Sequence, residues 1–113
     1  MLPKLHRLTK GSDFKRVYST GRNANGRRLR LKLAPNGLKQ VRVGVVVANS
    51  VSKHATKRNK VKRLIREAIR VQLAHIKPGM DIVISANNPS LTATFQDMQS
   101  ELAWLLTRAK LRT

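Results

Sequence analysis

The longest regular pattern of apolar and polar residues in this chain covers residues 57–76. Apolar positions recur there every three or four residues, which is the spacing of one face of an α-helix. Six residues share the inward arc of this helix: Val61, Leu64, Ile65, Ala68, Ile69 and Gln72. The turn-forming segment 77–79, Lys-Pro-Gly, is expected to end it.

Two shorter helices are predicted on either side of this one. The first begins at Ser12, which can cap its N-terminus, while Asp13 complements the helix dipole and Gly21 ends the helix. The last helix starts near Thr94, with Asp97 at the spacing of a capping box. Its apolar stripe, which we assign to the core together with Trp104, consists of Phe95, Met98, Leu102, Leu105 and Ala109.

Three segments have the pattern of strands. Residues 29–33 alternate strictly, which predicts a half-buried strand with its three leucines inward. Residues 40–48 form a β-branched run, and we expect them to pair with the first strand as an antiparallel hairpin through the turn at 35–37. Residues 81–86 are a short buried strand. The order α-β-β-α-β-α predicts an α/β fold of the α+β sandwich type, a mostly antiparallel sheet with helices packed on it, in one domain spanning 1–113.

The net charge of the chain indicates a class of function. The 113 residues hold 24 Lys and Arg against 5 Asp and Glu, for a net charge of +19. Nucleic acid is the commonest polyanion to which such a protein binds. Residues 1–70 carry 20 of the 24 basic groups, and none lies between Lys77 and Arg108. We therefore expect one strongly basic side that docks on a polyanion, with nucleic acid as the first candidate and an acidic membrane surface as the second.

Other classes of function find little support. The absence of cysteine removes disulfides, thiol catalysis and Cys-ligated zinc. The three histidines lack metal-ligand spacing, and the five carboxylates are too scattered for a two-metal nuclease. We expect no catalytic residue and no metal site in this chain. No apolar run approaches the ~20 residues of a membrane span, and the N-terminus lacks a signal-peptide core, so we expect a soluble cytoplasmic protein.

The predicted long helix has a basic outer face. Its first fourteen residues, 57–70, include seven basic residues and one acidic residue. Like charges four residues apart, such as Lys62 with Arg66, destabilise a free helix, and an ordinary solvated face mixes signs. A phosphate-binding surface is therefore favoured over a merely solvated one. The predicted RNA-binding residues are Lys57, Arg58, Asn59, Lys60, Lys62, Arg63, Arg66 and Arg70.

Two aromatic residues stand four apart on the first predicted helix, with basic residues between them and on the next strand. The aromatics either pack in the core or provide a platform on which unpaired bases stack, at about 1–3 kcal/mol per base. The second alternative predicts a cleft for single-stranded nucleic acid. Its residues would be Phe14, Lys15, Tyr18, Arg28, Arg30 and Lys32.

Several of these segments resemble one known family. Arg58-Asn59-Lys60-x-Lys62-Arg63-Leu64-Ile65-Arg66 resembles the RNR signature of the bacterial ribonuclease P protein component. Three further segments, at 13–21, 42–44 and 81–84, follow the order of that family, and the resemblance covers roughly residues 5–110. Two departures stand out. The second Arg of the signature is Lys60, which loses the bidentate fork, and Asn49 and Ser50 stand where the family often has a Lys pair.

The resemblance implies a protein subunit of a ribonucleoprotein that removes the 5′ leader from precursor tRNA. It implies that the RNA subunit carries the chemistry with Mg²⁺, and that the first helix and the sheet form a cleft for the leader. The implied partners are ribonuclease P RNA and precursor tRNA, with no membrane and no small-molecule substrate. It further implies an α/β sandwich with a left-handed βαβ crossover, against the usual right-handed rule. Composition alone fits a ribosomal or assembly RNA-binding protein without enzymatic role equally well.

Overall fold

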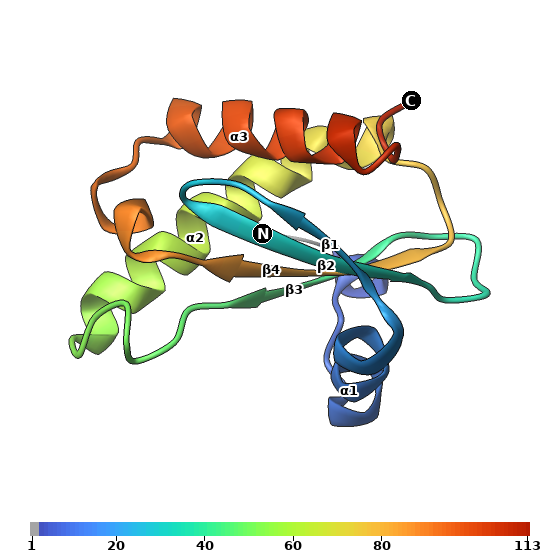
Figure 1. Ribbon diagram of the computed structural model, residues 1–113, viewed down its shortest axis with the longest axis horizontal. Helices are drawn as coiled ribbons and strands as arrows, with labels where there is room; N and C mark the ends of the chain where they lie inside the picture. Colours follow the sequence, from blue (N-terminus) through green and yellow to red (C-terminus); the bar gives the residue numbers. More distant parts are fainter. Residues whose placement is uncertain (1–2) are drawn as a thin grey trace.

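The computed structural model describes residues 3–113, which form a four-stranded sheet with α1 on one face and α2 and α3 on the other (Figure 1). Single 3-10 turns stand at Lys4–His6 and Leu73–His75, and a longer one at Asn88–Thr92. The main elements in chain order are α1 (Gly11–Thr20), β1 (Arg22–Asn25), β2 (Leu29–Pro35), β3 (Arg42–Val46), α2 (Ala55–Gln72), β4 (Met80–Ala86) and α3 (Phe95–Arg108).

The strands are arranged in the order β1-β2-β4-β3. β1 with β2 and β2 with β4 are antiparallel, whereas β3 and β4 are parallel and are joined through α2. The predicted mostly antiparallel sheet with a βαβ unit is therefore confirmed, and the hand of the crossover stays a prediction. The predicted hairpin between β2 and β3 is wrong, because β4 lies between them. β4 is the strand buried on both faces, and such a strand takes a central position.

β1 was absent from the predicted elements. Its sequence, Arg-Asn-Ala-Asn, has no apolar alternation, and three of its four residues are exposed. It is an edge strand that forms because its backbone pairs with β2, from Arg22 opposite Leu33 to Asn25 opposite Arg30. Such a polar strand cannot be recognised from the pattern of apolar residues. Its polar side chains protect the sheet edge from pairing with other chains.

The main core lies between the sheet and the pair α2 and α3. The inward leucines of β2 and the predicted arcs of α2 and α3 meet there as expected. Its largest fully buried side chains include Leu29, Leu31, Leu33, Ile65, Ile69, Ile82, Ile84, Met98, Leu102 and Leu105. The predicted capping box of α3 is present, since Thr94 and Asp97 each accept from the other's backbone N–H.

Two predicted helix boundaries differ from the structure. α1 begins at Gly11 with Lys10 as its N-cap and no capping side chain, so the assignment of Ser12 as the cap is wrong, while the end at Gly21 is confirmed. α2 begins at Ala55 and gives way to a 3-10 turn after Gln72.

A smaller core fixes α1 to the opposite face of the sheet. It consists of Leu8, Val17, Ala34 and Val83, with Phe14 packed against it. A Cβ on Gly44 would lie 2.5 Å from the Phe14 ring, so only glycine lets that ring rest on β3.

Candidate nucleic-acid interface

α1 covers only one end of its sheet face, and the register of the strands shows what remains open. Asn25, Arg30 and Ser85 stand in one cross-strand row on β1, β2 and β4. Asn25 and Arg30 are exposed and Ser85 is half-buried, whereas Ala34 and Val83, nearer α1, are buried. The uncovered row forms the floor of a polar and basic cleft beside the helix.

Tyr18 of α1 forms a wall of this cleft. The hollow has a volume of about 370 Å³. Its lining residues are Tyr18, Asn23, Asn25, Arg30, Leu31, Lys32 and Ser85. Tyr18 is 48% exposed, so its ring is available to a ligand. The structure thus brings together three of the six predicted cleft residues, in the arrangement of an aromatic side chain beside two cations that suits single-stranded nucleic acid.

Phe14 lies in a second hollow of about 270 Å³ on the same face, between α1 and β3. Its ring is half-buried against Gly44 and the small core, so packing is its main contact. Arg66 of α2 also lines this hollow. The basic helix and the α1 face therefore meet on one side of the molecule. Lys15 is exposed on α1 and lines neither hollow.

Arg28 does not join the other predicted cleft residues. Its Nη1 lies 3.3 Å from Oε1 of Glu101 on α3, which directs the side chain away from the α1 face. Oε2 of the same carboxylate accepts the backbone N–H groups of Arg28 and Leu29 at 2.8 and 2.6 Å. The alternation of β2 predicts Arg28 on the face of Arg30, but the turn before the strand breaks that alternation.

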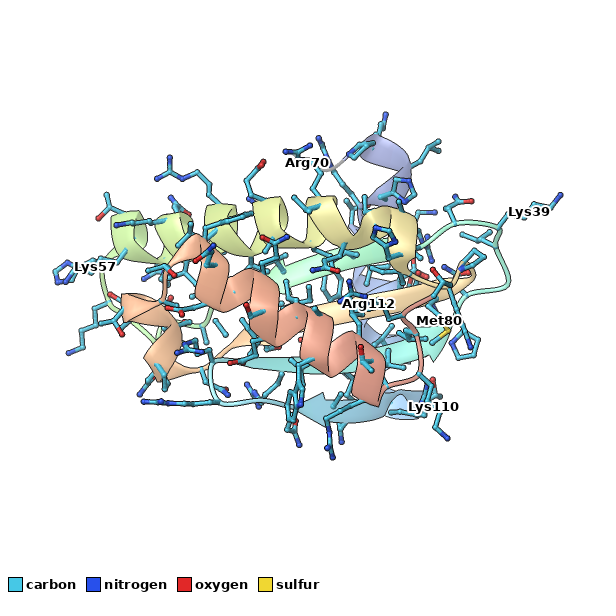
Figure 2. All side chains as sticks on the ribbon, turned by 90° about the horizontal axis from the view of Figure 1, so that it is seen from above. Lys39, Lys57, Arg70, Met80, Lys110 and Arg112 are labelled. Atoms are coloured by element: carbon cyan, nitrogen blue, oxygen red, sulfur yellow. The ribbon has the colours of Figure 1, made fainter. Side chains whose placement is uncertain are left out.

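The predicted basic residues of α2 lie along its outer surface, and Figure 2 shows Lys57 and Arg70 toward its opposite ends. Arg58 Nη1 donates to the Ser52 carbonyl at 2.8 Å, and Arg70 Nη2 lies 3.0 Å from Glu67. Five of the eight predicted residues are exposed: Lys57, Asn59, Lys60, Arg63 and Arg70. The other three are half-buried: Arg58, Lys62 and Arg66. With Glu67 as its one acidic residue, α2 presents a strongly positive surface.

An ion network around one buried carboxylate, which sequence reasoning missed, attaches α1 to the sheet. Asp81 is fully buried and accepts from Nε and Nη2 of Arg42, both at 2.8 Å. It also accepts from Arg16 of α1 and, at 2.9 Å, from Asn36. Hydrogen bonding to Asp81 raises the pKa of the Arg42 guanidinium above its usual value. A lone Asp at the start of an apolar strand was the available signal, because a buried carboxylate requires a partner.

All five carboxylates are engaged within the protein. Besides Asp81, Asp13 pairs with Arg42 at 3.4 Å, Glu67 with Arg70 and Glu101 with Arg28, and Asp97 caps α3. Within residues 3–113, no three His, Asp or Glu side chains are grouped so that they could hold a metal ion. These residues do not fit a Mg²⁺ site of the protein's own.

Two further findings concern the surface. Trp104 is 51% exposed, so its assignment to the core is wrong: it faces outward from α3 while its neighbours at 102, 105 and 106 face the core. In the described part of the chain, no helix combines the length and the apolar character needed to cross a bilayer.

Known proteins are similar to this chain in sequence and in fold. The family model for ribonuclease P matches residues 2–110. The ribonuclease P protein component of Picosynechococcus sp. is 38% identical over 109 residues, which cover 96% of this chain and 94% of that protein. The component of Clostridioides difficile is 40% identical over 102 residues, 89% of each chain.

Solved structures agree with these sequence relatives. The RNase P protein of Staphylococcus aureus has a TM-score of 0.85 at 31% identity, over 96% of this chain and 98% of that one. The protein of Thermotoga maritima has a TM-score of 0.82 at 29% identity, over 90% and 96%. These matches do not favour the alternative function, a ribosomal or assembly RNA-binding protein without enzymatic role. The chain belongs to the family of the bacterial ribonuclease P protein component.

Proposed function

We propose that this ribonuclease P subunit binds two RNAs, the ribonuclease P RNA through α2 and the 5′ leader of precursor tRNA in the cleft beside Tyr18. The observation that carries the proposal is the meeting of Tyr18, Arg30 and Lys32 in one cleft. Arg66 lines the neighbouring hollow on that face, so both RNAs can be held at one side of the protein. Precursor tRNA as substrate would place the protein in the cytoplasm.

The cleft suits an unpaired strand. A base of any identity can stack on the exposed ring of Tyr18, because every base has a π-face. Arg30 and Lys32 can neutralise the phosphates that follow, and the amides of Asn23 and Asn25 can bond to base edges or to the backbone. A mature tRNA has no leader and gains nothing from the stacking surface, so the cleft distinguishes substrate from product.

α2 would act through charge. Each Lys or Arg that neutralises a phosphate releases counterions, which favours association at low salt. The chain's own carboxylates are engaged in the fold, so we assign phosphodiester hydrolysis to the RNA subunit, which would use Mg²⁺. The protein's share is to screen phosphates and to position the leader.

Reconstitution tests this proposal. The protein should restore 5′ maturation of precursor tRNA by a bacterial ribonuclease P RNA at low Mg²⁺, and the protein alone should not cleave. In the holoenzyme, Tyr18→Ala should weaken precursor tRNA binding roughly five- to a hundred-fold, as expected for a lost stack, with mature tRNA nearly unaffected. Tyr18→Phe, which keeps the ring, is the matched control. Equal losses for precursor and mature tRNA would contradict leader binding at this site.

A further inference from the structure

The only tryptophan of the chain stands in solvent on the outer face of α3. One helical turn later, the Arg108 guanidinium lies 4.9 Å from the centroid of the Trp104 ring. The core does not need this side chain, because the opposite side of α3 is already filled by Met98, Leu102 and Leu105. A large exposed ring paired with an arginine is a surface that favours a planar partner.

A groove of about 480 Å³ runs beside Trp104, between α3 and the turn that joins β1 to β2. Its lining residues are Asn25, Gly26, Arg27, Arg28, Asp97, Ser100, Glu101 and Trp104. Figure 2 shows α3 crossing the sheet obliquely from the side of α2 toward β1, and Figure 1 shows it on the face opposite α1. The groove therefore lies on the side of the sheet opposite the α1 face.

The lining of the groove is formally neutral, but Arg27 in it and Arg108 beside Trp104 are exposed cations that favour an anionic partner. Two carboxylates lie in it, and both are engaged: Glu101 accepts from Arg28 and from the backbone of the turn, and Asp97 accepts from the backbone at the start of α3. Arg27 is exposed on the turn and Arg108 on the helix. These two guanidiniums can contact phosphates while the indole contacts a base.

The groove continues the cleft of Tyr18 around the edge of the sheet. Asn25 lines both hollows, one on each side of the β1–β2 turn. A single strand that leaves the cleft past Arg30 can therefore pass over this turn and reach Trp104. Glu101 fastens the end of this turn to α3, because it accepts the backbone N–H groups of Arg28 and of Leu29, the first residue of β2.

We propose that Trp104 and Arg108 form a second stacking site for unpaired RNA, occupied by leader nucleotides that extend beyond the cleft. The inference rests on the proposed function of the cleft. It predicts that a long 5′ leader binds more tightly than a short one, and that the increment depends on Trp104. Stacking on an indole tolerates any base, so the increment should vary little with leader sequence.

Trp104 fluorescence reads this site directly, because no other tryptophan contributes. The holoenzyme is titrated with precursor tRNAs whose leaders increase in length. We expect quenching only with leaders long enough to pass the β1–β2 turn. Trp104→Ala should weaken long-leader precursor binding roughly five- to a hundred-fold and leave short-leader binding unchanged. Trp104→Phe should recover part of the loss. Arg108→Ala should also weaken long-leader binding and leave short-leader binding unchanged. Lys39→Ala, which removes one charge from a distant loop, is its control (Figure 2).

The outcomes separate this site from the cleft. If only the proposal for the cleft is wrong, Tyr18→Ala should not change precursor binding at any leader length. Trp104→Ala should still weaken binding of long-leader precursors. The second site is overturned if Trp104→Ala weakens binding of long-leader and short-leader precursors equally, or weakens neither. It is also overturned if Trp104 fluorescence changes with protein concentration in the absence of RNA, which would assign the surface to a second copy of the chain. Because Trp104 is exposed, the variant should melt like the parent.

Discussion

Asp81→Asn is the substitution that most directly tests how the cleft is built. The change keeps the size of the side chain but removes the charge that holds Arg42 and Arg16. Arg16 comes from α1 and Arg42 from β3, so Asp81 adds an ionic link between the helix and the sheet to the small apolar core that also joins them. Its loss should therefore reduce both stability and the ability to hold a leader.

The structure sets the size of the effect. Removing one partner of a fully buried ion pair costs about 3–5 kcal/mol. Here the carboxylate is fully buried, but the Arg42 and Arg16 side chains keep 21% and 35% of their exposure, so water screens the charges left behind. We therefore expect the lower end, about 3 kcal/mol, or roughly a hundred-fold in the unfolding equilibrium. For a domain of this size, that corresponds to a fall in Tm of roughly 13 °C.

Urea denaturation and thermal melts of the free protein measure the loss, and the ratio of precursor to mature tRNA affinity in the holoenzyme measures the state of the cleft. Glu67→Gln is the matched control, because it makes the same change in net charge at an exposed carboxylate. The free energy of unfolding of this control should lie within about 0.5 kcal/mol of the parent's, as it does for ordinary surface substitutions. The reasoning is refuted if Asp81→Asn is as stable as the control, or if it loses stability with an unchanged precursor-to-mature ratio.

Three further predictions follow from the same structure. Changing Arg58, Lys62 and Arg66 together to Ala should lower the slope of log K against log salt for ribonuclease P RNA by about 0.7–0.9 per lost phosphate contact; a folded variant with an unchanged slope would show that this surface is only solvated. Phe14→Ala should cost less than the ~3–5 kcal/mol of a fully buried Phe, because its ring is half-buried; melts test this, and an unchanged Tm would place Phe14 outside the core. Backbone hydrogen bonding at the start of α3 lowers the pKa of Asp97, so its contribution is present above the unfolded pKa and is lost as pH falls through the lowered value. Asp97→Ala should therefore lower Tm at neutral pH and differ less from the parent in acid; a difference that persists in strong acid would contradict the assignment.

The sequence by itself determined the elements whose signals are local. Apolar spacing identified α2 and α3 and their inward faces, strict alternation identified the buried leucines of β2, and the Thr94 and Asp97 spacing identified a capping box that the structure contains. The order of basic residues on α2 was likewise readable, because a helix maps sequence spacing directly onto a surface. These features depend on neighbours within a few residues, which is why they could be predicted.

Tertiary structure decided everything that depends on distant partners. β2 pairs with β4 and not with its neighbour in sequence, and β1 exists only because β2 offers it an edge. Of the basic residues near the first helix, Arg16 is drawn to Asp81 and Arg28 to Glu101, while Arg30 remains in the cleft. Trp104 is exposed, although a large apolar side chain favours burial. Periodicity says which side of an element is apolar, but the partner of a charge or an exposed ring is set by residues that only folding brings within contact distance.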